Sequence, residues 1–204
     1  MTARDEVLAR IRYALSAPAD PVDPPRDYRR TGEHAPGAPQ LLQLLTERLT
    51  DYKATVHSAT PQTLGSVLAT ALHGTHRVVV PPGLPEEWMP ASAVVDDGDL
   101  SYADLDTVDA VLTACVAAAA DTGTIVLDAA ADQGRRAITL IPDRHVCVVR
   151  AAQVVQSVPE LLTRADPRRP LTFISGPSAT SDIELQRVEG VHGPRNLIVV
   201  ILND

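Results

Sequence analysis

Short, unbroken apolar runs place the tightest constraint on how this chain can fold. A strand with one solvent-exposed face would alternate apolar and polar residues, whereas these runs are apolar on both faces. Their strands must therefore belong to a sheet that other elements cover on both sides. The runs are RVVVP (77–81), TIVLD (124–128), HVCVVR (145–150) and LIVVIL (197–202).

Segments with helical spacing and further short strands lie between these runs, which predicts an α/β fold. In the helix expected at 60–74, Thr60 is the N-cap, Pro61 lies in the first turn and Gly74 ends the helix. Three strands in close succession after Thr122 predict a mixed sheet. Residues 109–120 suit a strand or a buried helix, and Pro159 is placed to split the last helix. The expected helices are 2–16, 41–52, 60–74 and 151–164, and the further strands are 53–58, 93–97, 137–142 and 170–175.

A proline-rich stretch separates the first helix from the rest of the chain. Residues 17–39 hold six of the 17 prolines, and proline disrupts helix interiors and central strands. An extended linker or surface wrap is therefore expected. We divide the 204 residues into an N-terminal helix with a Pro-rich extended segment (1–39) and one α/β domain (40–204).

Composition and charge exclude several classes of protein. The formal net charge of −8 argues against a broad nucleic-acid interface, which needs clustered Lys and Arg. Cys115 and Cys147 lie in apolar runs and form no CxxC motif, so we expect buried thiols and no metal or iron–sulfur site in this chain. The sequence has no 18-residue apolar span and no apolar signal core near Met1, which predicts a cytoplasmic protein without a membrane span.

Polar residues concentrate in SGPSATSDIELQRVEGVHGPRN (175–196), between two apolar runs. A glycine-proline turn follows a strand there and leads into an expected helix start, in which Ser181 and Glu184 have capping-box spacing. A helix N-terminus suits a carboxylate or a phosphate. A second turn, bracketed by Gly190 and Gly193, precedes the last strand. Because ligands of open α/β sheets bind beyond the carboxyl ends of strands, the stretch predicts a pocket for an anionic ligand.

Taken singly, each of these residues is explained equally well by a structural role. Glu184 can be a helix cap, and Asp182 with Glu184 can be a solvated helix face. His192 can be a loop histidine bonded to a backbone carbonyl. A His with an Asp also fits general acid–base chemistry, and no ligand spacing such as H-x-x-x-H supports a metal.

Arginines near the middle strands are further candidates for carboxylate binding. Arg135, Arg136 and Arg144 lie in or beside the connecting loops, and one of them could hold a carboxylate through two hydrogen bonds. Solvated loop arginines are the alternative. His145 begins a strand and is expected to be a core or edge histidine.

The segment FISGPSATSDIELQRVEGVHGPRNLIVVILND (173–204) resembles the C-terminal motif of the LUD domain, in the lactate-utilisation protein C family. The segment AAADTGTIVL (118–127) resembles the family's Ala-Glu-Thr-Gly-Thr segment, and the resemblance covers about residues 40–204. The residues that match the C-terminal motif are Gly176, Pro177, Ser178, Thr180, Asp182, Ile183, Glu184, Gly190, Val191, His192, Gly193 and Pro194.

The resemblance implies a single three-layer sandwich with a mixed, mostly parallel sheet, similar to CoA-transferases and ribose-phosphate isomerases. In CoA-transferases a Glu in a comparable turn is the nucleophile. Asp121 stands at that position here, one methylene shorter, and is either a nucleophile or a turn cap beside Thr122 and Gly123. The site expected from residues and resemblance together has catalytic Asp121, Asp182 and His192, no metal, and a ligand-binding set of Thr122, Gly123, Gly176, Pro177, Ser178, Thr180, Glu184 and Gly193.

The resemblance also implies a role in oxidising L-lactate to pyruvate together with iron–sulfur partner proteins. This chain would then bind a small carboxylate in its C-terminal loops. Backbone N–H groups near Ser178 and Thr180 would hold the carboxylate, and His192 would accept a proton from the 2-hydroxyl. Two alternatives stay open: a free-standing acyl/CoA-transferase or sugar-phosphate isomerase using Asp121 or Asp182, and a non-catalytic sensing or scaffold module. A homo-oligomer is compatible with either.

Overall fold

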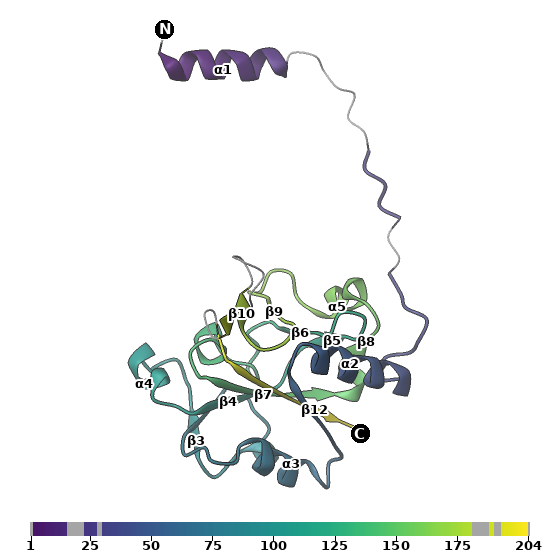
Figure 1. Cartoon of the computed structure of the whole chain (residues 1–204), viewed down its shortest axis with the longest axis vertical. Coiled ribbons are helices and arrows are strands. Elements are labelled where there is room, and N and C mark those ends of the chain that lie inside the picture. The colour runs from purple at the N-terminus through teal and green to yellow at the C-terminus, as the bar shows by residue number, and fades with distance from the viewer. Residues whose placement is uncertain (1, 16–22, 28–29, 181–187, 190–192, 204) are drawn as a thin grey trace.

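The computed structural model describes residues 2–15, 23–27, 30–180, 188–189 and 193–203. Its largest feature is a six-stranded sheet in the order β1-β12-β7-β4-β2-β3, in which every neighbouring pair is parallel. Figure 1 shows this sheet across the middle of the folded body. The strands are β1 (Thr55–Ala59), β2 (Val78–Val80), β3 (Ala93–Val95), β4 (Ala110–Thr113), β7 (Arg144–Arg150) and β12 (Asn196–Leu202).

Both faces of this sheet are buried, as the unbroken apolar runs predict. In β7, Val146 and Val148 belong to the core cluster on the side of α3 (Leu64–Ala71). Cys147 and Val149 belong to the cluster on the opposite face. Side chains alternate across a strand, so a strand that is apolar at every position needs cover on both sides. The α/β fold class predicted from the sequence is confirmed.

A second, mixed sheet of four strands packs over one face of the first, in the order β8-β5-β6-β9. β5–β8 is parallel, while β5–β6 and β6–β9 are antiparallel. A short antiparallel ribbon, β10 (Ala179–Thr180) with β11 (Val188–Glu189), stands beside it. The strands of the second sheet are β5 (Ala117–Ala119), β6 (Thr124–Leu127), β8 (Val154–Val155) and β9 (Thr172–Ile174).

Helices fill and cover the layers. α2 (Pro39–Asp51) buries Leu41, Leu45 and Leu49 among strands of both sheets. α5 (Val158–Arg164) packs on the outside of the four-stranded sheet through Leu161. α4 (Tyr102–Asp106) and the 3-10 turn η2 (Arg136–Thr139) cover the β2 and β4 end of the large sheet. The remaining elements are α1 (Ala3–Ala14) and the 3-10 turns η1 (Glu86–Trp88) and η3 (Ala151–Gln153).

Several predicted elements differ from the structure. Residues 137–142 form the end of η2 and a turn rather than a strand, and only Ile138 and Thr139 of η2 are buried. Residues 151–164 form η3, β8 and α5 rather than one helix. Pro159 lies in the first turn of α5, where a missing N–H costs no hydrogen bond, so it begins the helix instead of splitting it.

The structure also differs from the prediction in how strands are shared between the sheets and in where α3 begins and ends. The ambiguous residues 109–120 become two strands in two different sheets, β4 and β5. The predicted strand 170–175 joins the smaller sheet as β9, whereas β12 lies inside the large one. α3 begins after Thr63, not Thr60, because Thr60 to Thr63 form a hydrogen-bonded turn first. Its last residue is Ala71, and Gly74 follows in a left-handed conformation (φ +78°).

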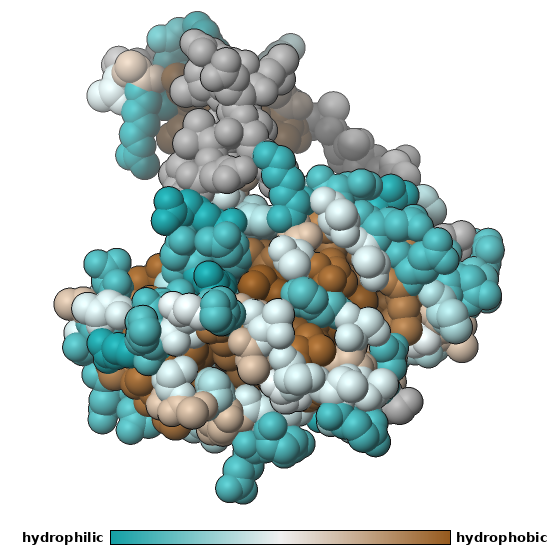
Figure 2. Space-filling view, turned by 60° about the horizontal axis from the view of Figure 1, so that its bottom comes forward, coloured by the Kyte–Doolittle hydropathy of each residue, from teal (hydrophilic) through white to brown (hydrophobic). Residues whose placement is uncertain are grey.

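The polypeptide before α2 is fastened to the body from Gly32 onward. The Gly32 N–H donates to Glu160 (2.8 Å), and the Gly37 N–H donates to the carbonyl of Val154 (2.9 Å). Of the described residues in α1, none is buried. On the face that Figure 2 brings forward, hydrophilic side chains lie mainly around the rim, and hydrophobic residues are visible among paler ones across the middle. Within the described part of the chain, no helix is long and apolar enough to cross a membrane.

Candidate functional site

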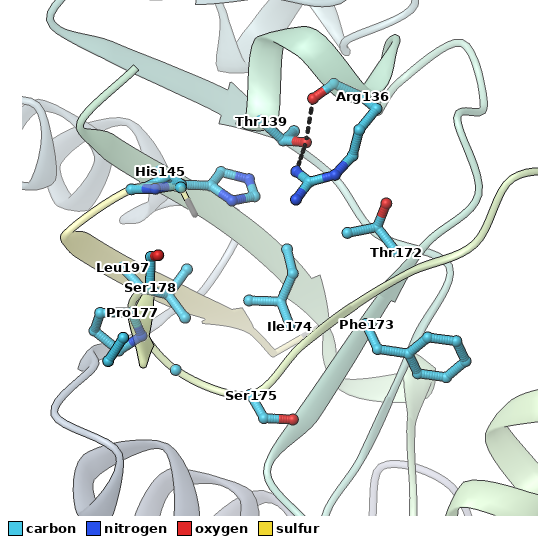
Figure 3. A pocket seen from close by; sticks show the side chains of 14 residues that line it. Arg136, Thr139, His145, Thr172, Phe173, Ile174, Ser175, Pro177, Ser178 and Leu197 are labelled. Carbon is cyan, nitrogen blue, oxygen red and sulfur yellow. Dashed lines mark hydrogen bonds between the residues drawn. The ribbon is translucent and has the colours of Figure 1, made fainter. Parts of the chain in front are cut away.

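A cavity of about 260 Å³ lies where the two sheets and η2 meet. The segment after β9 forms one wall, and the amino ends of β7 and β12 form another. Figure 3 shows these side chains around one shared space. The lining residues are Arg136, Thr139, His145, Thr172, Phe173, Ile174, Ser175, Gly176, Pro177, Ser178, Ala179, Gly193, Pro194 and Leu197.

The cavity lies at an edge of the large sheet that the sequence interpretation did not expect. Asn196 pairs with Arg144 at the amino ends of β12 and β7, so in the large sheet the cavity lies at the amino ends of the strands and not beyond their carboxyl ends. The first turn does follow a carboxyl end, that of β9 in the small sheet. The Ser178 N–H donates to the Pro194 carbonyl (2.8 Å), so the two polar turns meet although their strands lie in different sheets.

Gly176 shapes the wall after β9. Its φ is +102°, and a Cβ placed there would lie 2.6 Å from the Cβ of Tyr52 and 3.1 Å from the Tyr52 carbonyl oxygen. Only glycine tolerates both that conformation and that approach. The glycine therefore lets the chain turn tightly against the end of α2 and lines the cavity with backbone.

Arg136 supplies the positive charge of the cavity. Its guanidinium donates to Thr139 Oγ1 (3.0 Å), and Figure 3 shows it pointing toward the centre of the group. No carboxylate among the described residues forms an ion pair with it, since the described ion pairs involve other arginines. Partial burial lowers the pKa of Arg136, as expected for a cation removed from water without a neutralising partner.

His145 places a buried imidazole beside that guanidinium. The residue is 1% exposed, and its Nε2 lies 2.8 Å from the hydroxyl of Thr113 on the neighbouring strand β4. Burial, with the nearby charge of Arg136, lowers the pKa of His145 to about 4. The ring is therefore neutral at pH 7. The expectation of a core histidine is confirmed, and the structure adds that this histidine also lines the cavity.

Hydroxyl groups complete the polar part of the lining. Thr139, Thr172, Ser175 and Ser178 all contribute to it. Ser175 Oγ lies 2.8 Å from the hydroxyl of Thr124 in β6, which fixes the wall after β9 to the small sheet. Phe173, Ile174 and Leu197 supply an apolar side. Among its described lining residues the cavity thus combines one cation, several hydroxyls and a hydrocarbon surface, which suits a small organic anion.

The structure brings together one part of the predicted ligand-binding set. Gly176, Pro177, Ser178 and Gly193 line the cavity. The helix start expected after Gly176 is replaced at its first two positions by β10, to which Thr180 belongs. Asp182, Glu184 and His192, together with Ser181 and Gly190, lie outside the described residues.

The predicted turn of Asp121, Thr122 and Gly123 lies apart from this cavity. It joins β5 to β6, and none of its three residues belongs to the described lining. The Asp121 N–H donates to the Gln156 carbonyl (2.9 Å), and Thr122 Oγ1 lies 2.8 Å from Thr124 Oγ1. Gly123 has φ +60°, and a Cβ there would lie 2.7 Å from that of Arg48. The turn reaches the cavity only indirectly, through Thr124 and Ser175.

The three candidate arginines have different roles. Arg135 donates to both carboxylate oxygens of the buried Asp96 (2.8 and 2.9 Å). Arg144 donates to the carbonyl of His73 (3.1 Å), just beyond the end of α3. Arg136 alone of the three lines the cavity. Sequence reasoning could not separate them, because the turn η2 decides which of the neighbouring side chains faces inward.

The described residues include no group of three His, Cys, Asp or Glu side chains placed to hold a metal ion. Cys115 and Cys147 are buried free thiols, and a hydrogen bond with Cys147, together with burial, raises the pKa of Cys115. Two buried thiols are too few for an ordinary iron–sulfur cluster, which takes four cysteine ligands.

Comparison with known proteins places the cavity within a recognised domain. The sequence profile of the LUD domain matches residues 43–202. A lactate utilization protein C of Deinococcus radiodurans is 44% identical over 206 residues, which cover 98% of this chain and 95% of that protein. A lactate utilization protein C of an Exiguobacterium species is 29% identical over 226 residues, covering 100% and 97%.

A solved structure supports the fold. The crystal structure of a DUF162 family protein from Deinococcus radiodurans aligns with a TM-score of 0.69 and 40% sequence identity. The alignment covers 80% of this chain and 96% of that one.

Proposed function

The chain belongs to the LUD domain family, and from this premise we propose that it acts in lactate utilisation by binding a small carboxylate in the cavity around Arg136. The names of its relatives support the process. The observation that carries the ligand class is the Arg136 guanidinium, which faces the cavity without a carboxylate partner among the described residues.

Charge compensation favours an anion beside Arg136. A guanidinium withdrawn from water is unfavourable unless an anion neutralises it. A carboxylate matches the fork geometry of Arg through two parallel hydrogen bonds. The hydroxyls of Thr139 and Thr172 line the same space and can bond the ligand's oxygens. Ile174 and Leu197 offer contact for a short hydrocarbon group, as in L-lactate or pyruvate.

Oxidation of L-lactate to pyruvate releases two electrons and two protons, so an electron acceptor is needed. We place that acceptor on iron–sulfur partner proteins, because the thiols described here are two and both buried. In this proposal the chain works with its partners in the cytoplasm. It binds and orients the carboxylate while the electrons leave through the partner subunits.

Thermal unfolding with and without ligand tests the carboxylate site. Saturating L-lactate or pyruvate, at 100 times its dissociation constant, should stabilise the full chain by about 2.7 kcal/mol. For a chain of this size that is a rise in Tm of roughly 5–10 °C. Arg136→Gln should abolish the rise. Arg168→Gln is the matched control, because Arg168 is highly exposed and pairs only locally with Asp166.

An unchanged ligand response in Arg136→Gln would refute the site. The transferase or isomerase alternative gains no support from Asp121, which lies outside the described cavity lining, while its other candidate, Asp182, lies outside the described residues. Turnover of a CoA thioester or a sugar phosphate by the isolated chain would nevertheless establish it. A third outcome is that the chain binds a carboxylate, but neither Arg136→Gln nor Arg168→Gln changes the rate of lactate oxidation by the assembled system. That outcome would favour the sensing module.

A further inference from the structure

The cavity contains a second polar recognition group besides Arg136, and it differs from Arg136 in kind. Arg136 is a permanent cation, whereas the imidazole of His145 is uncharged and nearly enclosed. In Figure 3 the His145 ring points from β7 toward the Arg136 guanidinium. A ligand whose carboxylate sits on Arg136 therefore brings its next carbon atom close to this ring.

One nitrogen of His145 is occupied and the other is available. Nε2 lies 2.8 Å from Thr113 Oγ1, while Nδ1 has no hydrogen-bond partner within the described part of the chain. Every fully buried side-chain nitrogen or oxygen of the described residues has a partner. Nδ1 is therefore not fully buried, and the space that it reaches is the cavity that His145 lines.

The Thr113 hydroxyl can serve either tautomer of the imidazole. When its O–H donates to Nε2, the ring carries its proton on Nδ1 and offers a donor. When it instead accepts from Nε2–H, Nδ1 becomes an acceptor. A neutral histidine that is hydrogen-bonded to a rotatable hydroxyl can thus either donate to a carbonyl oxygen or accept from a hydroxyl group.

We propose that His145 Nδ1 binds the oxygen on C2 of the carboxylate ligand, with Thr113 as its positioning residue, so that the site selects 2-hydroxy and 2-oxo acids over plain carboxylates. The inference rests on the proposed function, because it needs a carboxylate on Arg136. The 2-hydroxyl of lactate donates to Nδ1, and the 2-carbonyl of pyruvate accepts from Nδ1–H. The same pocket then accommodates both oxidation levels.

The test compares acids that differ only at C2. L-Lactate, pyruvate and propionate are titrated calorimetrically into the full chain. Propionate keeps the carboxylate and the methyl group but lacks the C2 oxygen. The wild type should bind lactate and pyruvate about tenfold or more tightly than propionate, since a single well-placed hydrogen bond contributes about that factor.

Two variants assign the preference to its residues. His145→Phe should bind all three acids with the weak affinity of propionate, and its propionate affinity should stay within about twofold of wild type. Thr113→Val keeps the shape of the threonine but removes its hydroxyl. It should bring the affinities for lactate and pyruvate closer to that for propionate, while the propionate affinity stays unchanged. A merely structural role of Thr113 would change the affinity for all three acids.

A spectroscopic measurement on the wild type avoids the risk that a core variant fails to fold. In uniformly ¹³C,¹⁵N-labelled protein, the Nδ1 resonance of His145, assigned through bonds from its own backbone, should shift with lactate and with pyruvate but not with propionate. Equal affinity for the three acids, abolished by Arg136→Gln, would overturn the role of His145 and leave the carboxylate site standing. Failure of all three acids to bind would overturn both.

Discussion

His145 is a residue whose burial ties the stability of the fold to pH. Its pKa is lowered from 6.5 to about 4, first by burial and then by the charge of Arg136. Between those two pH values the unfolded chain binds a proton at this position and the folded chain does not. The free energy of unfolding must therefore fall as the pH is lowered through this window.

Between pH 6 and pH 5 we expect His145 to lower the free energy of unfolding by about 1 kcal/mol. Urea unfolding at pH 7, 6 and 5 measures it. His145→Gln removes the titrating group, so its stability should depend less steeply on pH across this range. Parallel pH profiles for the two proteins would show that the imidazole is already charged in the native state.

At Gly176 the backbone conformation and the close contact with Tyr52 require a glycine. With φ +102° and Tyr52 Cβ 2.6 Å from an added Cβ, Gly176→Ala should destabilise the fold by about 1–3 kcal/mol. Gly65 in α3 is a matched control, because a Cβ there meets nothing within 4 Å. Gly65→Ala should be neutral or stabilise by up to about 1 kcal/mol. Urea denaturation compares both variants with the wild type, and equal effects would contradict the steric argument.

At the scale of elements, the sequence predicts best where burial alone decides. β7 and β12 are apolar at successive positions because both of their faces are covered, and that pattern is local. β8 is different, since Val154 and Val155 become a strand only by pairing with Ala118 and Ala119. β6, η2, β7 and η3 lie between β5 and β8 in the sequence, so no local sequence pattern reveals this pairing.

The candidate site shows the same limit. The two glycine turns could be read from the sequence as a pair, because they flank one polar stretch. Arg136 and His145 could not be assigned to that pair. They come from η2 and β7, and the packing of the small sheet against the large one brings them to Gly176 and Gly193. The sequence interpretation placed the pocket beyond the carboxyl ends of strands, which holds for β9 but not for β7 and β12, because β9 and β12 belong to different sheets.

The start of α5 joins two elements through one side chain. The Glu160 carboxylate accepts N–H groups from Gly32 (2.8 Å), Gln156 (3.0 Å) and Ser157 (3.1 Å). Glu160→Ala should cost about 1–2 kcal/mol, because it removes a helix cap and the attachment of Gly32. Glu160→Gln retains an accepting oxygen and should lose less. Limited proteolysis near Arg30 should be faster in Glu160→Ala, whereas an unchanged cleavage rate would contradict this attachment.

At the scale of the whole molecule, we predict that the body that carries the cavity folds without the N-terminal helix. α1 has a capping box at Thr2 and Asp5, yet a helix of this length is marginal in water without packing. None of its described residues is buried. Among the hydrogen bonds of the described residues, the first that joins this N-terminal part to the body is that of Gly32 to Glu160, within the stretch predicted to be an extended linker or surface wrap.

Two truncations test where the folded body begins. Removing residues 1–31 should change the free energy of unfolding by no more than about 0.5 kcal/mol and leave lactate and pyruvate binding intact. Removing residues 1–38 also deletes the hydrogen bonds of Gly32 to Glu160 and of Gly37 to Val154. That second truncation should destabilise the body by about 1–2 kcal/mol. If the first truncation lowered stability or ligand affinity instead, α1 would have to dock on the body, and the apolar side chains of Val7 and Ile11, both exposed in this structure, would be the first to substitute.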